Sequence, residues 1–261
     1  ILLQLVATGK PLSTVGMRIE DRTRTFIIAM ERTVVPENFS FRMTDEEYRV
    51  LEKIKNSIPV CYLADHADFA LGIVTGNNKK FLSAEKTEHS EMVLKGTDIC
   101  KYHINPAKQY LRFEPEQFQQ VAPLEIYRAP EKLLYRFISN QLVVAYDDRQ
   151  MLSLNSCNIV IPKIEGMQIK YILAILNSSV SQFVYQKEFH SIKVLRAHME
   201  HIPIPRVGKA IQNEIIAMTE PLICGMGKEA AETCQKRLDC RIMDLFRLSA
   251  EEQWIIRHAL H

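Results

Sequence analysis

The sequence lacks the short motifs that hold nucleotides or build common active sites. It has no G-x-G-x-x-G or phosphate-loop pattern, no G-x-S-x-G elbow and no H-E-x-x-H pair. A cofactor cradle, a hydrolase elbow and a zinc-protease helix therefore have no candidate. The histidines have no partnered nucleophile, so a hydrolase with an unrecognised site is the least favoured alternative.

Cysteine spacing and the length of apolar runs exclude further classes. The six cysteines are scattered and no two have C-x-x-C spacing, which argues against a zinc knuckle and favours reduced thiols in an intracellular protein. No apolar run is long enough to span a bilayer, so we expect no membrane partner. The chain starts at Ile1, and we expect it to be a piece of a longer protein.

An excess of one charge is also lacking. The chain has 33 basic and 31 acidic residues, for a formal net charge of +2. A protein that holds nucleic acid by electrostatics alone carries a larger excess, so only a local basic patch could do so here. Hydrophobic residues make up 47% of the 261, enough for a core in one large domain or two small ones.

Strand and turn signals dominate the first two thirds of the chain. An apolar run over 25–30 follows a polar turn, which predicts a hairpin, and Thr44 with Glu47 forms a capping box for a helix ending near Asn56. Short β-rich runs then extend from Ile58 to about Pro162, with a predicted hairpin tip at 147–150. They predict a curved, mostly antiparallel sheet or part-barrel.

Helical periodicity dominates the rest. Apolar spacing predicts one long helix over 168–187, and the prolines of Ile202-Pro-Ile-Pro205 require an extended segment. Helices are predicted over 209–219 and 228–246, and Ser249 with Glu252 forms another capping box. The fold class is therefore α+β, with packed helices and a C-terminal helical segment.

Polar clusters suggest two kinds of site. The stretch GIVTGNNKKF (72–81) is either a plain hairpin tip or a loop that rests on an anion. Asp147-Asp148, or the group of His190, His198 and His201, could hold a metal, but a hairpin tip and surface or phosphate-facing groups are the favoured interpretations. We therefore predict no metal site.

At this point the order of segments resembles the C-terminal specificity domain of TaqI-like adenine DNA methyltransferases, including fused restriction–modification enzymes. The resemblance covers about residues 58–256. It is carried by GIVTGNNKKFL (72–82), LKGTDICKY (94–102), YDDRQMLSLNSCNIVIP (146–162), YILAILNSSVSQFVY (171–185), HIPIP (201–205) and IMDLFRLSAEEQWII (242–256). The third of these resembles a hairpin found in such specificity domains.

The resemblance implies a division into three parts. Residues 1–57 would be the tail of an upstream, methyltransferase domain plus a connecting helix, 58–206 the DNA target-recognition domain, and 207–261 a C-terminal helical segment. The upstream domain would bind S-adenosylmethionine, so this chain would have no cofactor and no catalytic residue of its own. Its partners would be double-stranded DNA and the methyltransferase domain or subunit, in a prokaryotic cytoplasm.

Candidate DNA-binding residues follow from this resemblance together with side-chain type. Gly76 would let the backbone of its loop approach DNA closely. Arg149, Gln150 and Ser153 are the candidates for sequence specificity. The full set is Thr75, Gly76, Asn77, Asn78, Lys79, Lys80, Arg136, Arg149, Gln150, Ser153, Lys187, Lys193 and Arg196.

An alternative from another class stays open. A free-standing specificity subunit would use its C-terminal helices to assemble with separate methyltransferase or nuclease subunits. The helix predicted over 228–246 is too short for a long coiled-coil spacer, which favours the recognition domain of a larger enzyme.

Overall fold

The structure is a computed structural model that describes residues 17–20, 25–29, 32, 42–189 and 191–260. Met30 and His190, which enter two of the sequence predictions, lie outside these residues. The chain divides into two compact units, Ile1–Leu51 and Glu52–His261. No helix within the described ranges is both long and apolar enough to cross a membrane.

The first unit contains the predicted hairpin strands. β1 (Met17–Glu20) and β2 (Thr25–Ile28) pair antiparallel. α2 (Asp45–Asn56) starts in this unit with the predicted capping box, because Thr44 Oγ1 accepts the N–H of Glu47 and the Glu47 carboxylate accepts the N–H of Thr44. Its end at Asn56 is also as predicted.

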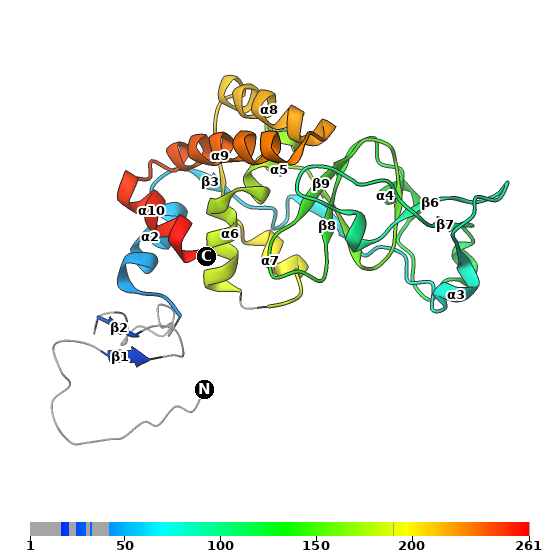
Figure 1. Ribbon diagram of the computed structural model, residues 1–261, viewed down its shortest axis with the longest axis horizontal. Helices are drawn as coiled ribbons and strands as arrows, with labels where there is room; N and C mark the ends of the chain where they lie inside the picture. The colour runs from blue at the N-terminus through cyan, green and yellow to red at the C-terminus, as the bar shows by residue number, and fades with distance from the viewer. Residues whose placement is uncertain (1–16, 21–24, 30–31, 33–41, 190, 261) are drawn as a thin grey trace, which may run out of the picture. The chain divides into compact units, whose positions relative to one another are not determined.

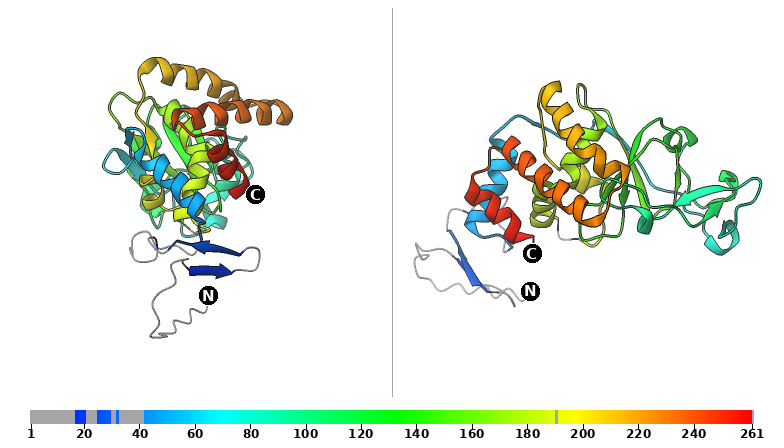
Figure 2. Two further views of the ribbon diagram at one scale, coloured as in Figure 1. Left: turned by 90° about the vertical axis from the view of Figure 1, so that its left-hand side faces the viewer. Right: turned by 45° about the horizontal axis from the view of Figure 1, so that its top comes forward.

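The second unit contains two four-stranded sheets (Figures 1 and 2). One has the order β4-β11-β8-β9 and is antiparallel throughout. The other has the order β10-β6-β7-β5, with only β10 and β6 parallel. Their strands are β4 (Ala67–Ala70), β5 (Leu82–Ser83), β6 (Glu91–Leu94), β7 (Tyr110–Leu111), β8 (Lys132–Arg136), β9 (Val144–Asp147), β10 (Leu152–Ser153) and β11 (Cys157–Pro162).

The two sheets share one apolar core. Val93 and Leu111 from one sheet pack in the same buried cluster as Leu134 and Ile159 from the other. The opposite face of β8 and β9 is covered by α5 (Ile169–Asn177), so that residues 132–135 of β8 are buried on both faces. The α+β class and the mostly antiparallel sheets are as predicted, and neither sheet closes into a barrel within the described residues.

Helices form the outer layers of the unit. α8 (Lys209–Cys224) packs on α5, and α9 (Lys228–Leu245) packs on α8 and α6. α10 (Ala250–Ala259) begins at the predicted Ser249–Glu252 capping box. β12 (Ile204–Pro205) pairs with β3 (Val60–Cys61), which confirms the extended Ile202–Pro205 segment. α8 runs five residues beyond the predicted end at Thr219.

The prediction of one long helix over 168–187 is wrong in one respect, because this segment forms two helices. α5 ends at Asn177 and α6 (Ser179–Glu188) begins after Ser178, whose hydroxyl accepts the Ser181 N–H. The new helix ends have partners: Lys101 Nζ donates to Asn177 O, and Asp239 accepts from Ser179 N and Oγ. A cation at a helix C-terminus and a carboxylate at an N-terminus both oppose the end charges of the helix dipole.

Neither predicted hairpin at 72–81 or 146–162 forms. β4 pairs with β11 and β5 with β7, so the 72–81 segment connects two sheets. β9 and β11 both pair with β8, which lies between them, and β10 pairs with β6. Long-range ladder hydrogen bonds, which local turn signals do not encode, decide these pairings.

Candidate nucleic-acid interface

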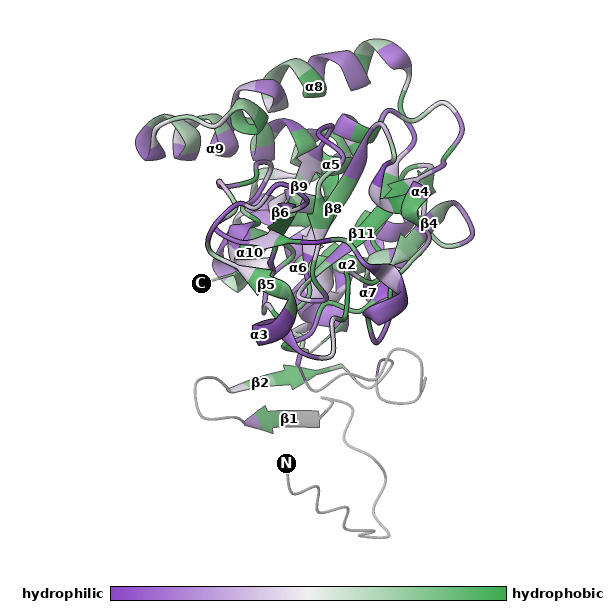
Figure 3. Ribbon diagram, turned by 90° about the vertical axis from the view of Figure 1, so that its right-hand side faces the viewer, coloured by the Kyte–Doolittle hydropathy of each residue, from purple (hydrophilic) through white to green (hydrophobic). Residues whose placement is uncertain are grey.

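The predicted loop at 75–80 is a compact, exposed tip that includes a short helix. α3 (Asn78–Phe81) is capped by Asn77, whose side chain accepts the N–H of Lys80. Gly76 has φ of +76°, a conformation that favours glycine. All residues from Gly76 to Lys80 are exposed, and Figure 3 shows α3 as a hydrophilic segment. The tip therefore presents amide and ammonium groups to solvent.

Thr75 lies beneath this tip. Its side chain is buried, and its hydroxyl donates to Asn78 Oδ1 over 2.6 Å. Lys80 Nζ donates to Gln117 Oε1 over 3.2 Å, and it lies 4.6 Å from the centroid of the Phe81 ring. The hydroxyl of Thr75 thus supports the tip from inside.

The second predicted group, at 149–153, divides between surface and core. Arg149 and Gln150 are exposed in the turn after β9, whereas Ser153 is fully buried in β10. The turn borders a hollow of about 280 Å³ lined by Lys86, Ser90, Glu91, Met92, Tyr110, Arg128, Arg149, Gln150 and Met151. Two donor side chains therefore face solvent at a concave surface, and Ser153 does not.

The Arg136 side chain donates its hydrogen bonds to backbone carbonyls within the fold. Its Nε donates to Gly96 O over 2.9 Å and its Nη2 to Ile99 O over 2.6 Å. These bonds hold the LKGTDI segment against β8. An arginine committed to two backbone carbonyls has few donors left for a phosphate.

The third predicted group surrounds α7 (Arg196–Glu200). Arg196 is exposed, pairs with Glu200 at 2.7 Å, and lies 5.2 Å from the Phe69 ring centroid. Lys193 is exposed, with its Nζ 5.9 Å from the Phe137 ring, whereas Lys187 is half-buried near Phe183. Arg196 also lines a groove of about 620 Å³ with Phe69, Leu71 and the segment 120–123.

One segment links two of these groups. Gln117 contacts Lys80, the Cβ of Gln119 lies 3.4 Å from where a Cβ on Gly76 would stand, and Gln120 pairs with Val74. Residues 120–123 then line the groove that Arg196 borders. The α3 tip and Arg196 thus lie at the two ends of one continuous segment.

The sequence prediction did not include Lys86, Arg128 and Phe69. Arg128 donates from one Nη to Gln150 O and from the other to Glu91 at 2.6 Å. Its proximity to the predicted turn depends on pairing between distant strands, so no local pattern could have placed it beside that turn. A basic residue next to aromatic residues was the only available signal.

His198 and Asp147, from the two predicted polar clusters, have structural roles. His198 Nδ1 accepts the Leu195 N–H, and its ring stacks on Phe189 with centroids 4.6 Å apart. Burial lowers the pKa of His198, which disfavours a cationic, phosphate-facing form. Asp147 is fully buried in an ion pair with Lys132. The described part of the chain contains no group of three potential metal ligands.

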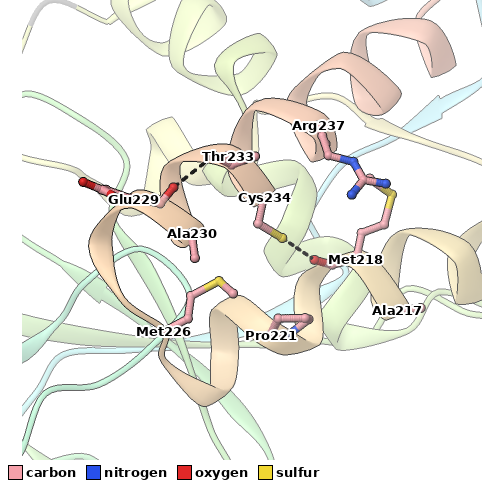
Figure 4. A pocket seen from close by; sticks show the side chains of 9 residues that line it. All are labelled: Ala217, Met218, Pro221, Met226, Glu229, Ala230, Thr233, Cys234 and Arg237. Carbon is pink, nitrogen blue, oxygen red and sulfur yellow. Dashed lines mark hydrogen bonds between the residues drawn. The ribbon is translucent and has the colours of Figure 1, made fainter.

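A separate apolar groove lies between α8 and α9 (Figure 4). It has a volume of about 620 Å³ and is lined by Ala217, Met218, Pro221, Met226, Glu229, Ala230, Thr233, Cys234 and Arg237. Met226 is 39% exposed, and Cys234 Sγ donates to Met218 O. None of the predicted DNA-binding residues lines this groove.

Comparison with solved structures finds similar folds at low sequence identity in two enzymes, MmeI and BpuSI, and a weaker match in a third protein. A type IIL restriction–modification enzyme, MmeI, in complex with DNA matches 76% of this chain with a TM-score of 0.50 and 12% identity. The type IIG restriction endonuclease BpuSI matches 91% with a TM-score of 0.50 and 11% identity. The HsdS subunit from Thermoanaerobacter tengcongensis matches 83% with a TM-score of 0.41 and 14% identity.

The chain spans only part of each of these proteins. The matches cover 35% of the MmeI chain, 35% of the BpuSI chain and 50% of the HsdS chain. A comparison with curated protein sequences finds no match. Residues 91–204 match the family model of the TaqI-like C-terminal specificity domain, a range that contains three of the six motifs above and all but the last residue of a fourth, HIPIP. Over this segment, which runs from β6 through β11 and α5 to α7, the chain is therefore similar to the TaqI-like C-terminal specificity domain.

Proposed function

We propose that this chain recognises a DNA sequence for an adenine-specific DNA methyltransferase or restriction–modification enzyme. In this role it holds the duplex while a catalytic domain outside the chain methylates an adenine. The match of residues 91–204 to the TaqI-like specificity domain carries the proposal. The fold it shares with MmeI, an enzyme solved in complex with DNA, is consistent with it.

The chemistry of the exposed groups supports this role. Amide and ammonium groups at the α3 tip, and Lys193 and Arg196 near α7, suit phosphate oxygens. Arg149 and Gln150 have the donor patterns that read guanine and adenine edges in the major groove. Thr75, Arg136 and Ser153 act in this proposal from inside the fold, since their polar groups point into it.

The proposed protein has more parts than this chain. Residues 1–57 would end an upstream methyltransferase domain, 58–206 would recognise the target, and 207–261 would complete the helical support. S-adenosylmethionine would bind to the upstream domain, and this chain would carry no catalytic group. Because the proposed target is double-stranded DNA, we expect the protein to work in the cytoplasm of a prokaryote.

The α8–α9 groove favours a second candidate function. An apolar channel with an exposed methionine suits the apolar face of a partner helix. In a free-standing specificity subunit, this helix would belong to a separate methyltransferase or nuclease subunit.

Selection from random duplexes tests the main proposal. The chain is incubated with a random duplex pool at low and moderate salt, and the retained DNA is sequenced. An enriched short motif is expected. Salt-sensitive retention without a motif would place sequence readout in the absent catalytic half. No retention at either salt concentration would overturn the proposal in favour of the assembly subunit, which is then tested by binding to a methyltransferase subunit.

A further inference from the structure

We propose that Lys132, Asp147 and Arg128 are positioning residues that hold the 147–151 turn in the shape in which Arg149 and Gln150 read DNA bases. This inference rests on the proposed function and adds the residues that fix its specificity element. None of the three needs to touch DNA. They act through the backbone of the turn.

The first support is a buried ion pair at the base of the turn. Lys132 Nζ lies 2.6 Å from Asp147 Oδ2 and donates to Tyr127 O at 2.6 Å. Both side chains are 0% exposed. The two residues are ladder partners where β8 begins and β9 ends. Burial lowers the pKa of Lys132, and the Asp147 carboxylate opposes that shift.

A buried ion pair is a weak explanation of stability, because an apolar pair of similar volume often stabilises as well. The Asp147 carboxylate has a second task that an apolar side chain could not perform. Its Oδ1 accepts the N–H of Arg149 and its Oδ2 accepts the N–H of Met151, both over 2.9 Å. Lys132 therefore holds the acceptor that shapes the turn.

Arg128 fixes the other side of the turn. Its Nη1 donates to Gln150 O over 2.7 Å, and its Nη2 donates to Glu91 of β6 over 2.6 Å. Gln150 has φ of +57°, which is unfavourable for a residue with a side chain. Three backbone groups of a strained turn are thus bonded to the side chains of Asp147 in β9 and Arg128 before β8. Lys132 of β8 and Glu91 of β6 in turn bond to these two side chains.

The consequence is that the two exposed side chains start from a preset backbone. Arg149 and Gln150 border the hollow with Lys86, Met92 and Tyr110. A base-contacting side chain whose backbone is already held in the bound conformation loses less conformational entropy when it binds its base. Base selectivity should therefore depend on the three supporting residues, whereas general phosphate binding should not.

The experiment compares variants of the full chain in the random-duplex selection. R128M removes the hydrogen bond to the carbonyl of Gln150. The double variant K132M/D147L removes both buried charges together, so that neither charge is left buried without its partner. R149A/Q150A removes the readers themselves. R241M/E214M removes an ion pair between α8 and α9 and is the matched control.

We expect R128M and K132M/D147L to lose about tenfold discrimination at the base positions that R149A/Q150A also affects. The retention of DNA at low salt and the slope of log K against log salt should both stay at wild-type values. A general loss of folding would change both. Thermal unfolding checks that each variant is folded. If K132M/D147L does not fold, the result for R128M alone tests the inference.

Two results would overturn the inference without touching the proposed function. One is a wild-type motif that R128M and K132M/D147L retain as fully as the R241M/E214M control does. The other is a motif unchanged in R149A/Q150A, which would mean that the turn reads no base. If the wild-type chain selects no motif at all, the proposed sequence readout fails and this inference fails with it.

Discussion

Gly72 and Gly96 show how closely two of the six sequence motifs pack against one stretch of backbone. A Cβ on Gly72 would stand 2.1 Å from Leu154 O, and one on Gly96 would stand 2.5 Å from Ser156 O. Gly72 belongs to GIVTG and Gly96 to LKGTD. Both motifs therefore need glycine because the backbone at 154–157 passes against them.

Replacing Gly72 should severely destabilise the second unit. We expect Gly72→Ala to lower the free energy of unfolding by more than about 2 kcal/mol, because the new methyl group meets backbone atoms that cannot move independently. Gly76→Ala is the control, with an expected cost of about 1 kcal/mol from its positive φ alone. Denaturant unfolding measures both, and equal costs would contradict the packing explanation.

A second prediction about single residues concerns Lys79 and Lys80 of the α3 tip. We expect Lys79→Ala with Lys80→Ala to weaken duplex binding and to reduce the slope of log K against log salt by about 2, if each lysine neutralises one phosphate. Lys209→Ala with Lys228→Ala, at the exposed starts of α8 and α9, is the control. An unchanged slope in the tip variant would remove both lysines from the interface.

At the scale of elements, the break between α5 and α6 is set by one amide. Asn177 is fully buried, with Oδ1 accepting Val144 N over 3.1 Å and Nδ2 donating to Val144 O over 2.8 Å. The side chain therefore completes the hydrogen bonds of β9 and ends the helix at the same point. The apolar spacing on either side of Ser178 is continuous, so periodicity alone predicts one helix.

Removing this amide should cost more than removing the cap beside it. We expect Asn177→Ala to cost roughly 2–3 kcal/mol, because the buried N–H of Val144 loses its acceptor, while Val144 O keeps only the N–H of Tyr102. Ser178→Ala should cost about 1 kcal/mol as an ordinary cap loss. Chemical unfolding of both variants tests the order, with exposed Asn155→Ala as the neutral control. The reverse order would mean that the cap, and not the amide, makes the break.

The start of α10 gives an element-scale prediction with a pH dependence. Burial tends to raise the pKa of Glu252, but bonds from Lys53 and Ser249 outweigh it, so that the pKa is lowered. A lowered carboxyl pKa stabilises the fold above the unfolded pKa of about 4.3, and that stabilisation is lost as the pH falls through the folded pKa.

Glu252→Gln should therefore destabilise the protein by up to about 1 kcal/mol at pH 7 and converge with the wild type at pH 3. Ser249→Ala removes an uncharged cap, so its cost should persist at both pH values. Urea unfolding at the two pH values distinguishes them. A Glu252→Gln cost that is the same at pH 3 would rule out the charge as its origin.

At the scale of the whole second unit, ion pairs join segments that are far apart in sequence. Lys55 at the end of α2 bonds Glu188 at the end of α6, and Lys53 lies 2.6 Å from Glu252 of α10. Tyr171 of α5 donates its hydroxyl to Pro205 O, beside the β12–β3 pair. The end of α2 is thus bonded to helices from the last third of the chain.

Charge exchange tests the first of these links. Lys55→Glu and Glu188→Lys should each destabilise the protein, since each places like charges together, and the double exchange should recover about 1 kcal/mol of coupling. The same cycle on Arg196 and Glu200, which are one turn apart in α7, is the control for a purely local pair. No coupling between Lys55 and Glu188 would mean that their bond does not hold the two segments together.

The sequence alone determined the capping boxes at Thr44 and Ser249, the extended proline segment, the α+β class and the family resemblance, because capping boxes, proline geometry and apolar periods are local properties. It also identified Arg149 and Gln150 as exposed polar residues of a turn. It did not reveal that β8 lies between β9 and β11, that Ser153 is buried, or that Arg128 holds the turn. Only the tertiary structure decided these points, because strand pairing and buried hydrogen bonds join residues whose proximity no local pattern encodes.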